Sequence, residues 1–195
     1  MFKRYQNLLA RRPILTNMVQ TGVLFGTGDC LAQKLFPHKD DGQYDYERTL
    51  RAIVYGGIIF APVGHQWYVL LSKFNPSRSK VVNTICKVGL DQLGFAPIIG
   101  IPMYYSVMTI LEQKPIESIE TKLRQNWWPT LRNNWLIWPG FQLFNFYVIP
   151  LQYRLLVVNI LSIGWNTYLS YELNKKSPLI EGDINQLVLA EPIED

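Results

Sequence analysis

The stretch from Trp127 to Phe146 reads Trp-Trp-Pro-Thr-Leu-Arg-Asn-Asn-Trp-Leu-Ile-Trp-Pro-Gly-Phe-Gln-Leu-Phe-Asn-Phe. Aromatic and amide side chains recur in it at the three- and four-residue steps that share one face of a helix: Trp135, Trp138, Gln142 and Asn145. Residues 133 to 153 carry no Lys, Arg, Asp or Glu. An uncharged segment of about 20 residues matches the thickness of a bilayer's hydrocarbon core, about 30 Å. The stretch therefore predicts a membrane helix with one polar face.

Prolines set the expected limits of this helix. Pro129 is expected in its first turn, where the missing N–H costs no hydrogen bond, whereas Pro139 is expected to loosen the helix from inside. Pro150 predicts a hairpin or a sharp break before a last helix. That last helix again has a one-sided polar stripe, formed by Asn159, Ser162, Asn166 and Ser170.

Further long charge-free intervals, at 13 to 28, 52 to 72, 92 to 111 and 155 to 171, occur along the chain. The wet face of a soluble helical bundle would carry a charge every few residues. We therefore predict an all-α fold, a multi-pass integral membrane helix bundle with four to five transmembrane helices, over residues 13–172. The expected spans cover about 14–36, 50–72, 83–111, 131–150 and 151–172.

The two ends of the chain account for a mean hydropathy of only +0.02. The first acidic residue is Asp29, so residues 1–12, which include Arg11 and Arg12, form a basic amphipathic segment. It suits either mitochondrial targeting or a juxtamembrane helix that orients the first span. Residues 173–195 form an acidic tail that we expect to be flexible. The net charge of +4, without a run of five basic residues, indicates no direct nucleic-acid binding.

Ionisable and amide side chains fall inside the apolar segments. A carboxylate at membrane depth is costly and has to face protein, water or a cation. The polar side chains either bond to one another and hold the bundle together or line a wet passage, and the acidic members favour the passage. His65 fits a hydrogen-bonded interface residue better than a gate. The candidate pore or bundle-interior residues are Asp29, Gln33, His65, Asp91, Gln92, Gln142, Asn145, Asn159 and Asn166.

Small and repeated motifs complete the pattern. Gly22-x-x-x-Gly26 is the small-residue spacing that lets helix backbones touch in lipid. Phe60-Ala61-Pro62 recurs 35 residues later as Phe95-Ala96-Pro97, although a tripeptide is too short to prove a duplication. Trp67 and the adjacent tyrosine are expected in an aromatic belt at the headgroups.

The sequence lacks a Gly-rich phosphate loop, a metal-ligand spacing of Cys and His, and a nucleophile motif. We therefore expect no enzyme, with no catalytic residue, no cofactor and no metal. The expected partners are the lipid bilayer and small solutes of unknown identity. A homo-oligomer stays open.

The run Trp135-x-x-Trp138-Pro139-x-x-Gln142-x-x-Asn145-Phe146, followed by Pro150 and Arg154, resembles the signature of the peroxisomal membrane protein 22 kDa / Mpv-seventeen family. Other pieces resemble the family in the same order over about residues 8 to 172. They include Gly28-Asp29, Pro62 with His65-x-Trp67-Tyr68, Asp91-Gln92 with Pro97, and Trp165-x-x-Tyr168-Leu169-Ser170. The stretches around Arg154 and Trp165 are most similar to the fungal mitochondrial stress-response branch.

This resemblance implies a location and a role. It implies a mitochondrial inner-membrane protein, in preference to a peroxisomal one, with a part in mitochondrial DNA maintenance, stress tolerance and ethanol metabolism. Family members are regarded as pore-forming or solute-moving proteins. The expected function is a channel or conduit for small solutes, and the alternative is a non-transporting scaffold that organises the membrane.

Overall fold

The computed structural model describes residues 2–36 and 43–174 and is helical throughout them, apart from short connections, with no strand in these ranges. The all-α prediction is therefore confirmed. Ten helical elements follow one another in this part of the chain: α1 (Phe2–Arg11), α2 (Pro13–Leu35), α3 (Tyr46–Val54), η1 (Tyr55–Phe60), α4 (Ala61–Lys73), α5 (Lys80–Gly89), η2 (Leu90–Gly100), α6 (Ile101–Leu111), α7 (Glu117–Val148) and α8 (Leu151–Asn174). The elements η1 and η2 are π-helical.

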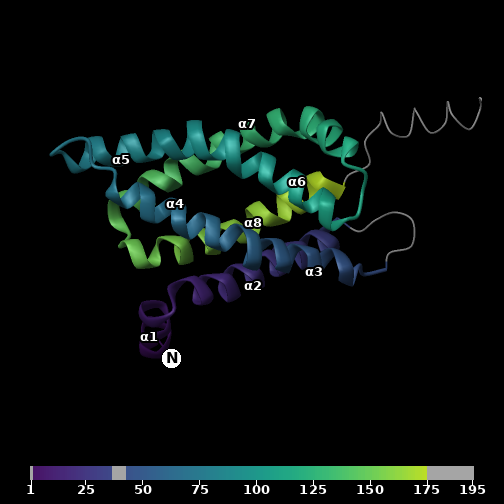
Figure 1. The fold of residues 1–195 in the computed structure, drawn as a ribbon, viewed down its shortest axis with the longest axis horizontal. Helices are drawn as coiled ribbons and strands as arrows, with labels where there is room; N and C mark the ends of the chain where they lie inside the picture. The colour runs from purple at the N-terminus through teal and green to yellow at the C-terminus, as the bar shows by residue number, and fades with distance from the viewer. Residues whose placement is uncertain (1, 37–42, 175–195) are drawn as a thin grey trace, which may run out of the picture.

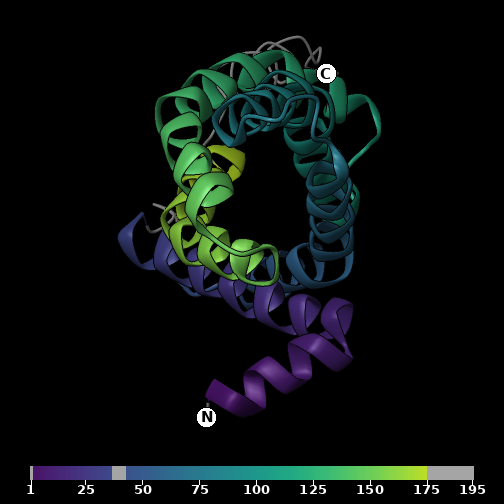
Figure 2. The ribbon, with the colours of Figure 1, turned by 90° about the vertical axis from the view of Figure 1, so that its left-hand side faces the viewer.

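Five long rods make up the body of the molecule, because α3, η1 and α4 run on without a break, as do α5, η2 and α6. The other rods are α2, α7 and α8. They lie lengthwise beside one another in Figure 1, and Figure 2 shows them end-on as a ring. The helix α1 leaves the ring at an angle. The α4–α5 and α7–α8 connections lie at the same end as α1, and the α6–α7 connection lies at the opposite end.

The two π-helical segments occupy equivalent places in two rods. They begin at Tyr55 and Leu90, which are 35 residues apart, the same separation as the two Phe-Ala-Pro tripeptides. Single π-helical turns inside α-helices occur often at functional sites. The sequence echo therefore has a structural counterpart, since a π-helical segment begins seven residues before the proline of the tripeptide in each rod.

The rods α2 and α3–η1 touch through glycine, as the spacing of Gly22 and Gly26 predicts. A Cβ on Gly26 would lie 2.6 Å from Cγ1 of Ile53. A Cβ on Gly57 would lie 2.9 Å from the carbonyl oxygen of Met18, and Gly22 faces Gly57 directly. Any larger side chain here would push the two backbones apart, so these glycines set the distance between the rods.

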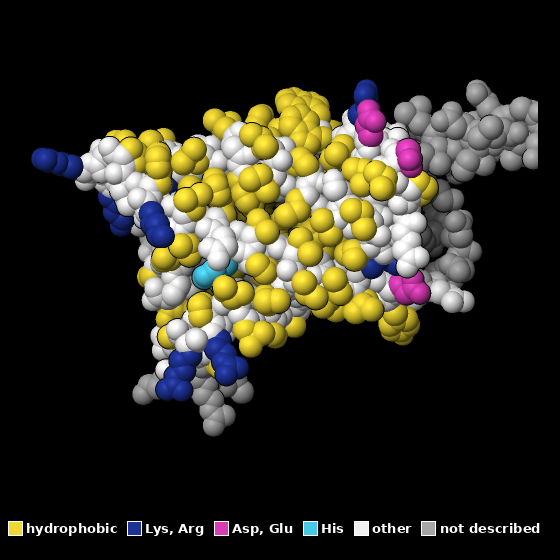
Figure 3. Space-filling model, viewed as in Figure 1, with side chains coloured by type: hydrophobic (Ala, Val, Ile, Leu, Met, Phe, Trp, Pro, Cys, Tyr) yellow, Lys and Arg dark blue, Asp and Glu magenta, His cyan; other side chains and the backbone are white. Residues whose placement is uncertain are grey.

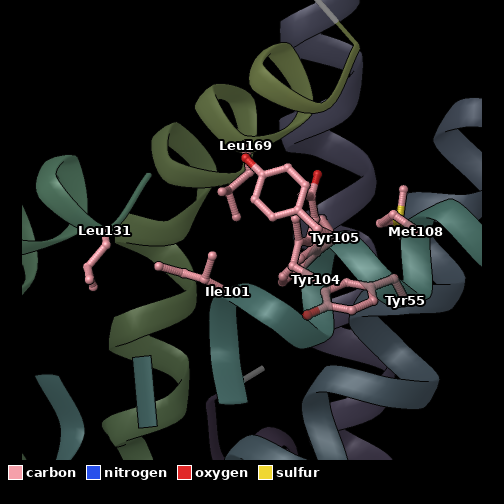
Figure 4. Packing of buried hydrophobic residues seen from close by; sticks show 8 residues of the cluster. Tyr55, Ile101, Tyr104, Tyr105, Met108, Leu131 and Leu169 are labelled. Carbon is pink, nitrogen blue, oxygen red and sulfur yellow. The ribbon is translucent and has the colours of Figure 1, made fainter. Parts of the chain in front are cut away.

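Apolar side chains fill one end of the ring. Tyr55, Tyr104, Tyr105, Met108 and Leu131 belong to one buried cluster, which Figure 4 shows between η1, α6 and the neighbouring helices. Tyr55 and Tyr104 meet edge to face, with ring centroids 5.2 Å apart. Such pairs contribute about 0.5–1.5 kcal/mol beyond the burial of their area.

The outer surface is also apolar. Leu15, Val19 and Val23 lie one turn apart on α2 and are all exposed, as are Ile98 and Leu136 on other rods. Figure 3 shows hydrophobic side chains over the middle of one face and charged ones near its ends. Within the described residues, one continuous helical segment, Lys80–Leu111, is long and apolar enough to cross a membrane. The count of four to five spans stays a prediction.

Two details of the helix limits concern prolines. The break at Pro150 is confirmed, because α7 ends at Val148 and α8 begins at Leu151. The placement of Pro129 in a first turn is wrong, because α7 begins at Glu117 and holds both Pro129 and Pro139 in its interior. Interior prolines are tolerated where neighbouring helices satisfy the freed carbonyls. Apart from its first two residues, the predicted acidic tail lies outside the described residues.

Candidate functional site

The rods enclose a cavity of about 820 Å³, its open mouth included. Its lining comes from every rod and is dominated by aromatic rings, among them Phe25, Tyr55, Trp67, Trp138 and Trp165. Large apolar cavities with a few convergent polar groups are the usual form of small-molecule sites. The cavity is therefore the candidate functional site.

The polar part of the lining centres on Asp91 of η2, whose side chain is buried. Trp67 Nε1 donates to Asp91 Oδ1 at 2.8 Å. The Nε2 atoms of Gln92 and Gln142 donate to Asp91 Oδ2 at 2.7 and 3.0 Å. All three donors are uncharged. None of the residues described in the lining is a Lys, Arg or His, so no cation faces the carboxylate there.

Further amides extend this network across α7. Gln142 also donates to the Tyr68 hydroxyl at 3.2 Å, and Asn145 donates to Gln142 Oε1 at 3.1 Å. Asn134 donates to Gln92 Oε1 at 2.9 Å. The network joins α4, η2 and α7, and bonds of this kind between the helices of a membrane bundle are worth about 0.6 kcal/mol on average. It holds Asp91 in one position on the cavity wall.

Two tryptophans of α7 bond to backbone carbonyls beside prolines. In a π-helix each N–H bonds to the carbonyl five residues earlier, so Pro97 leaves the Gln92 carbonyl without a helical partner. Trp135 Nε1 donates to that carbonyl at 2.9 Å. Trp127 Nε1 donates at 2.9 Å to the carbonyl of Pro97, which lies five residues before Pro102. The indole N–H groups thus replace backbone donors that the prolines lack.

A second acidic site lies at one end of the bundle. Arg48 Nε of α3 donates to Asp29 Oδ1 at 2.7 Å, and Ser170 of α8 also donates to Oδ1. Gln33 and Thr49 donate to Oδ2 at 2.8 and 2.7 Å. Asp29 is 1% exposed and lies outside the cavity lining. A buried carboxylate with a cation and three further donors forms a clamp between α2, α3 and α8, called here the Asp29 clamp.

The other amide and imidazole candidates bond between rods. Asn17 Nδ2 lies 3.2 Å from His65 Nδ1, and Asn159 donates to Thr21 at 2.8 Å. Asn166 lines the cavity, and both of its amide atoms are buried without a partner among the described residues. The sequence candidates therefore divide into three settings. Asp91, Gln92, Gln142 and Asn166 line the cavity, with Asn145 bonded to Gln142 from outside the lining; Asp29 and Gln33 belong to the clamp, and His65 and Asn159 lie at helix contacts.

The signature residues have separate roles. Trp138 lines the cavity, and its Nε1 is buried without a partner in the described part of the chain. Phe146 packs edge to face on Tyr68, with centroids 5.9 Å apart. Arg154 donates to the carbonyls of Phe146 and Ile149, both at 3.0 Å, and so caps the C-terminal end of α7 at the break before α8.

Sequence reasoning missed three features of the site. Trp67 and Tyr68 were assigned to a headgroup belt, and this is wrong, because both line the cavity and Trp67 stacks on Phe95. The inward face of α7 passes through Asn134 and Trp138, whereas Trp135 is 37% exposed. The third missed feature is the ion pair of Arg48 with Asp29. Arg48 lies shortly before the charge-free interval 52 to 72, and Asp29 directly follows the interval 13 to 28. Opposite charges at the edges of two apolar segments were the available sequence signal for this ion pair.

The geometry defines a class, a helical membrane protein whose bundle surrounds an aromatic cavity with one uncompensated carboxylate.

Residues 109–170 match the family model described as the Mpv17 / PMP22 family. A Debaryomyces hansenii protein named Protein SYM1 is 53% identical, over 95% of this chain and 95% of its own. Proteins of the same name from Candida albicans and Saccharomyces cerevisiae are 50% and 46% identical, over 90% and 92% of this chain and 97% and 91% of their own. No solved structure matches.

This chain belongs to the Mpv17 / PMP22 family. The resemblance of the Trp135–Phe146 signature to that family is therefore confirmed. Among the residues that carried the resemblance, Trp138 and Gln142 line the cavity and Arg154 caps α7.

Proposed function

We propose that this protein is a multi-pass bundle of five transmembrane rods that forms a conduit for small solutes in the mitochondrial inner membrane. The observation that carries the proposal is the cavity inside the ring of helices. Asp91 lies on its wall, and none of the described residues that line it is a Lys, Arg or His. Intramembrane carboxylates that face a cavity mark solute or ion pathways. The apolar outer surface of α2 supports the same placement in lipid.

Reconstitution tests the conduit. Liposomes that contain the purified protein are expected to release small cations and uncharged solutes. The Asp91 carboxylate on the cavity wall should slow the release of anions. The matched pair is Asp91→Asn, which removes the charge on the cavity wall, and Glu47→Gln, which removes an exposed charge on α3. Loss of the cation preference in the first variant alone supports the conduit. Liposomes that stay tight with every variant and with the natural protein would overturn it.

The orientation is a separate proposal. The basic N-terminus and the 73–80 loop lie at the same end of the bundle, so the positive-inside tendency assigns that end to the matrix. With five spans, the residues after α8 lie on the opposite side. Protease clipping of the acidic tail in mitoplasts, but not in intact mitochondria, supports this arrangement. Protection of the tail in both preparations would contradict the five-span count.

A scaffold without transport is the second candidate function, and the Asp29 clamp favours it. There the polar groups satisfy one another, which is the bonding that a purely structural bundle needs. The scaffold predicts that Asp91→Asn leaves all solute fluxes unchanged.

Under either function we propose no enzymatic activity, and we propose roles in mitochondrial DNA maintenance, stress tolerance and ethanol metabolism. Growth of a deletion strain on ethanol under heat stress, with and without the Asp91 variant, tests whether those roles depend on the cavity.

A further inference from the structure

Unused hydrogen-bonding groups lie in the cavity wall. Asn166 is 4% exposed, and neither its Nδ2 nor its Oδ1 has a partner among the described residues. Trp138 is 6% exposed, and its Nε1 also has no partner in this part of the chain. Buried polar groups are nearly always hydrogen-bonded, because an unsatisfied one loses its bonds to water and gains none in the protein. These two side chains together hold two donor atoms and one acceptor atom that no described residue engages.

The neighbouring rings shape the space around these groups. Trp165 packs edge to face on Trp138, with centroids 5.9 Å apart, and Trp67 stacks on Phe95 at 4.9 Å. All four rings line the cavity. Aromatic walls bind flat rings by stacking and by edge-to-face contact. The shape of the lining therefore suits a planar molecule.

The charge of the lining restricts the ligand further. Asp91 is held by three uncharged donors, Trp67, Gln92 and Gln142, and the described lining contains no basic side chain. An anion in the cavity would face this carboxylate in a medium that screens it weakly, which disfavours its binding. A cation would be attracted by the carboxylate and by the aromatic faces. Phosphate esters and carboxylates are therefore disfavoured.

We propose that the cavity binds planar aromatic amides, uncharged or singly positive, and rejects their anionic counterparts. The primary amide of such a ligand has the donor and the acceptor that complement Asn166, and its ring would lie against the aromatic side chains that line the cavity. The proposal deepens the proposed function, because it names the class of solute for the conduit, and it rests on that function only for transport. Binding of the ligand to the protein in detergent can be measured without any transport, so it tests the ligand class independently of the conduit.

Three probes of nearly constant size test the charge rule: 1-methylnicotinamide (a cation), nicotinamide (uncharged) and nicotinate (an anion). Binding is measured by isothermal titration of the purified full chain and by quenching of its tryptophan fluorescence. We expect 1-methylnicotinamide to bind at least as tightly as nicotinamide, and nicotinate at least tenfold more weakly. Equal affinities for the three probes, or no binding of either amide, would overturn the proposal.

Variants test the assigned atoms. Asn166→Leu is expected to weaken nicotinamide binding about tenfold, because it removes the donor and the acceptor while keeping the branched shape of the side chain. The matched control is Asn133→Leu, on a side chain that bonds to Tyr168 and lies outside the lining. Trp138→Phe removes one N–H, keeps an aromatic ring and should weaken binding less, so it tests the site even if the Asn166 variant does not fold. Equal losses in Asn166→Leu and Asn133→Leu would contradict the site.

Flux separates this proposal from the conduit. Nicotinamide that binds but does not cross liposomes containing the protein would overturn the conduit and leave the binding site. Equal flux of nicotinamide and nicotinate would keep the conduit and overturn the ligand class.

Discussion

Asp29 and Asp91 resemble each other in the sequence, since both are acids in apolar helices with a glutamine close by. Their surroundings in the structure differ. Asp29 is paired with Arg48 at 2.7 Å and lies away from the cavity. Asp91 accepts only from uncharged donors and lies on the cavity wall. The first carboxylate is paired with a cation between rods, whereas the second lies on the cavity wall with only uncharged donors around it.

The comparison shows how one residue type serves two purposes in a membrane bundle. Removing one partner of a buried ion pair leaves an uncompensated charge, which is strongly destabilising. Changing a carboxylate held by neutral donors alters hydrogen bonds and charge but strands no opposite charge. The two sites should therefore respond to mutation in different measurements, one in unfolding and the other in selectivity.

The largest effect is expected from Arg48→Met, which leaves Asp29 buried without its cation. The free energy of unfolding should fall by about 3–5 kcal/mol, as for other broken buried ion pairs. The control is Arg51→Met, one turn away, whose partners Asp45 and Glu47 are largely exposed and which should cost about 1 kcal/mol or less. Urea titration of the protein in mild detergent measures both. Similar losses in the two variants would show that the Asp29 clamp is no stronger than a surface pair.

A smaller loss of stability is expected from Asp91→Asn. The amide keeps the shape of the carboxylate but cannot accept from all of Trp67, Gln92 and Gln142, so unfolding should become easier by about 1–2 kcal/mol. The cation preference of liposome flux should disappear. Asp29→Asn should leave that preference unchanged, because Asp29 does not line the cavity. A change of selectivity in Asp29→Asn alone would reverse the two roles.

Trp135→Phe tests the backbone beneath the Asp91 site. It removes the indole donor to the Gln92 carbonyl and should cost about 1 kcal/mol. Hydrogen exchange should rise in η2, around Asp91, and stay unchanged near Asp29. The control is Trp128→Phe, because Trp128 is 56% exposed and its ring contacts are preserved by phenylalanine. Faster exchange in η2 in both variants would contradict the assigned role of the indole N–H.

The smallest effect concerns an ion pair at the end of the bundle, outside the apolar segments. Glu112 Oε2 lies 2.7 Å from Lys122 Nζ and 2.8 Å from Lys114 Nζ. Burial alone would raise the pKa of Glu112, but its bonds and ion pairs with the two lysines outweigh that effect and lower the pKa. The same burial lowers the pKa of Lys122, because desolvation of the ammonium outweighs its attraction to Glu112.

The sign of the pH dependence follows from the lowered pKa of Glu112. The stabilising contribution of this group is complete above its unfolded-state pKa and is lost as the pH falls through the lower folded-state pKa. We expect an acid-side loss of about 1 kcal/mol or less. Unfolding curves recorded between neutral pH and acid should show a flatter acid limb for Glu112→Gln. An unchanged acid limb in that variant would exclude Glu112 as its source.

Several elements followed from the sequence because their causes are local. The charge-free intervals predicted where long helices lie, and Pro150, which cannot continue the hydrogen-bond ladder, marked the break before α8. The polar stripe of α8 is buried throughout, from Asn159 to Ser170, because helical periodicity alone puts these residues on one face. The Gly22 spacing likewise predicted a close helix contact.

Other assignments needed the helices to be packed against one another. Periodicity says which residues share a face, but it does not say which neighbour that face meets. The partner of Asp29 is Arg48, from another rod, and the donors to Asp91 include Trp67 and Gln142, from two rods other than its own. The positions of the prolines were visible in the sequence, but the indole that satisfies the Gln92 carbonyl comes from a helix far along the chain.

The sequence by itself thus determined the all-α class, the long helices, their polar faces and the family. Only the tertiary structure decided that one acid is neutralised in a clamp and the other faces the cavity. The physical reason is that the energy of a buried charge depends on the charges and donors within a few ångströms, and those are brought together by contacts between distant segments. Asp29 and Asp91 carry the same local sequence signal, and their partners alone separate them.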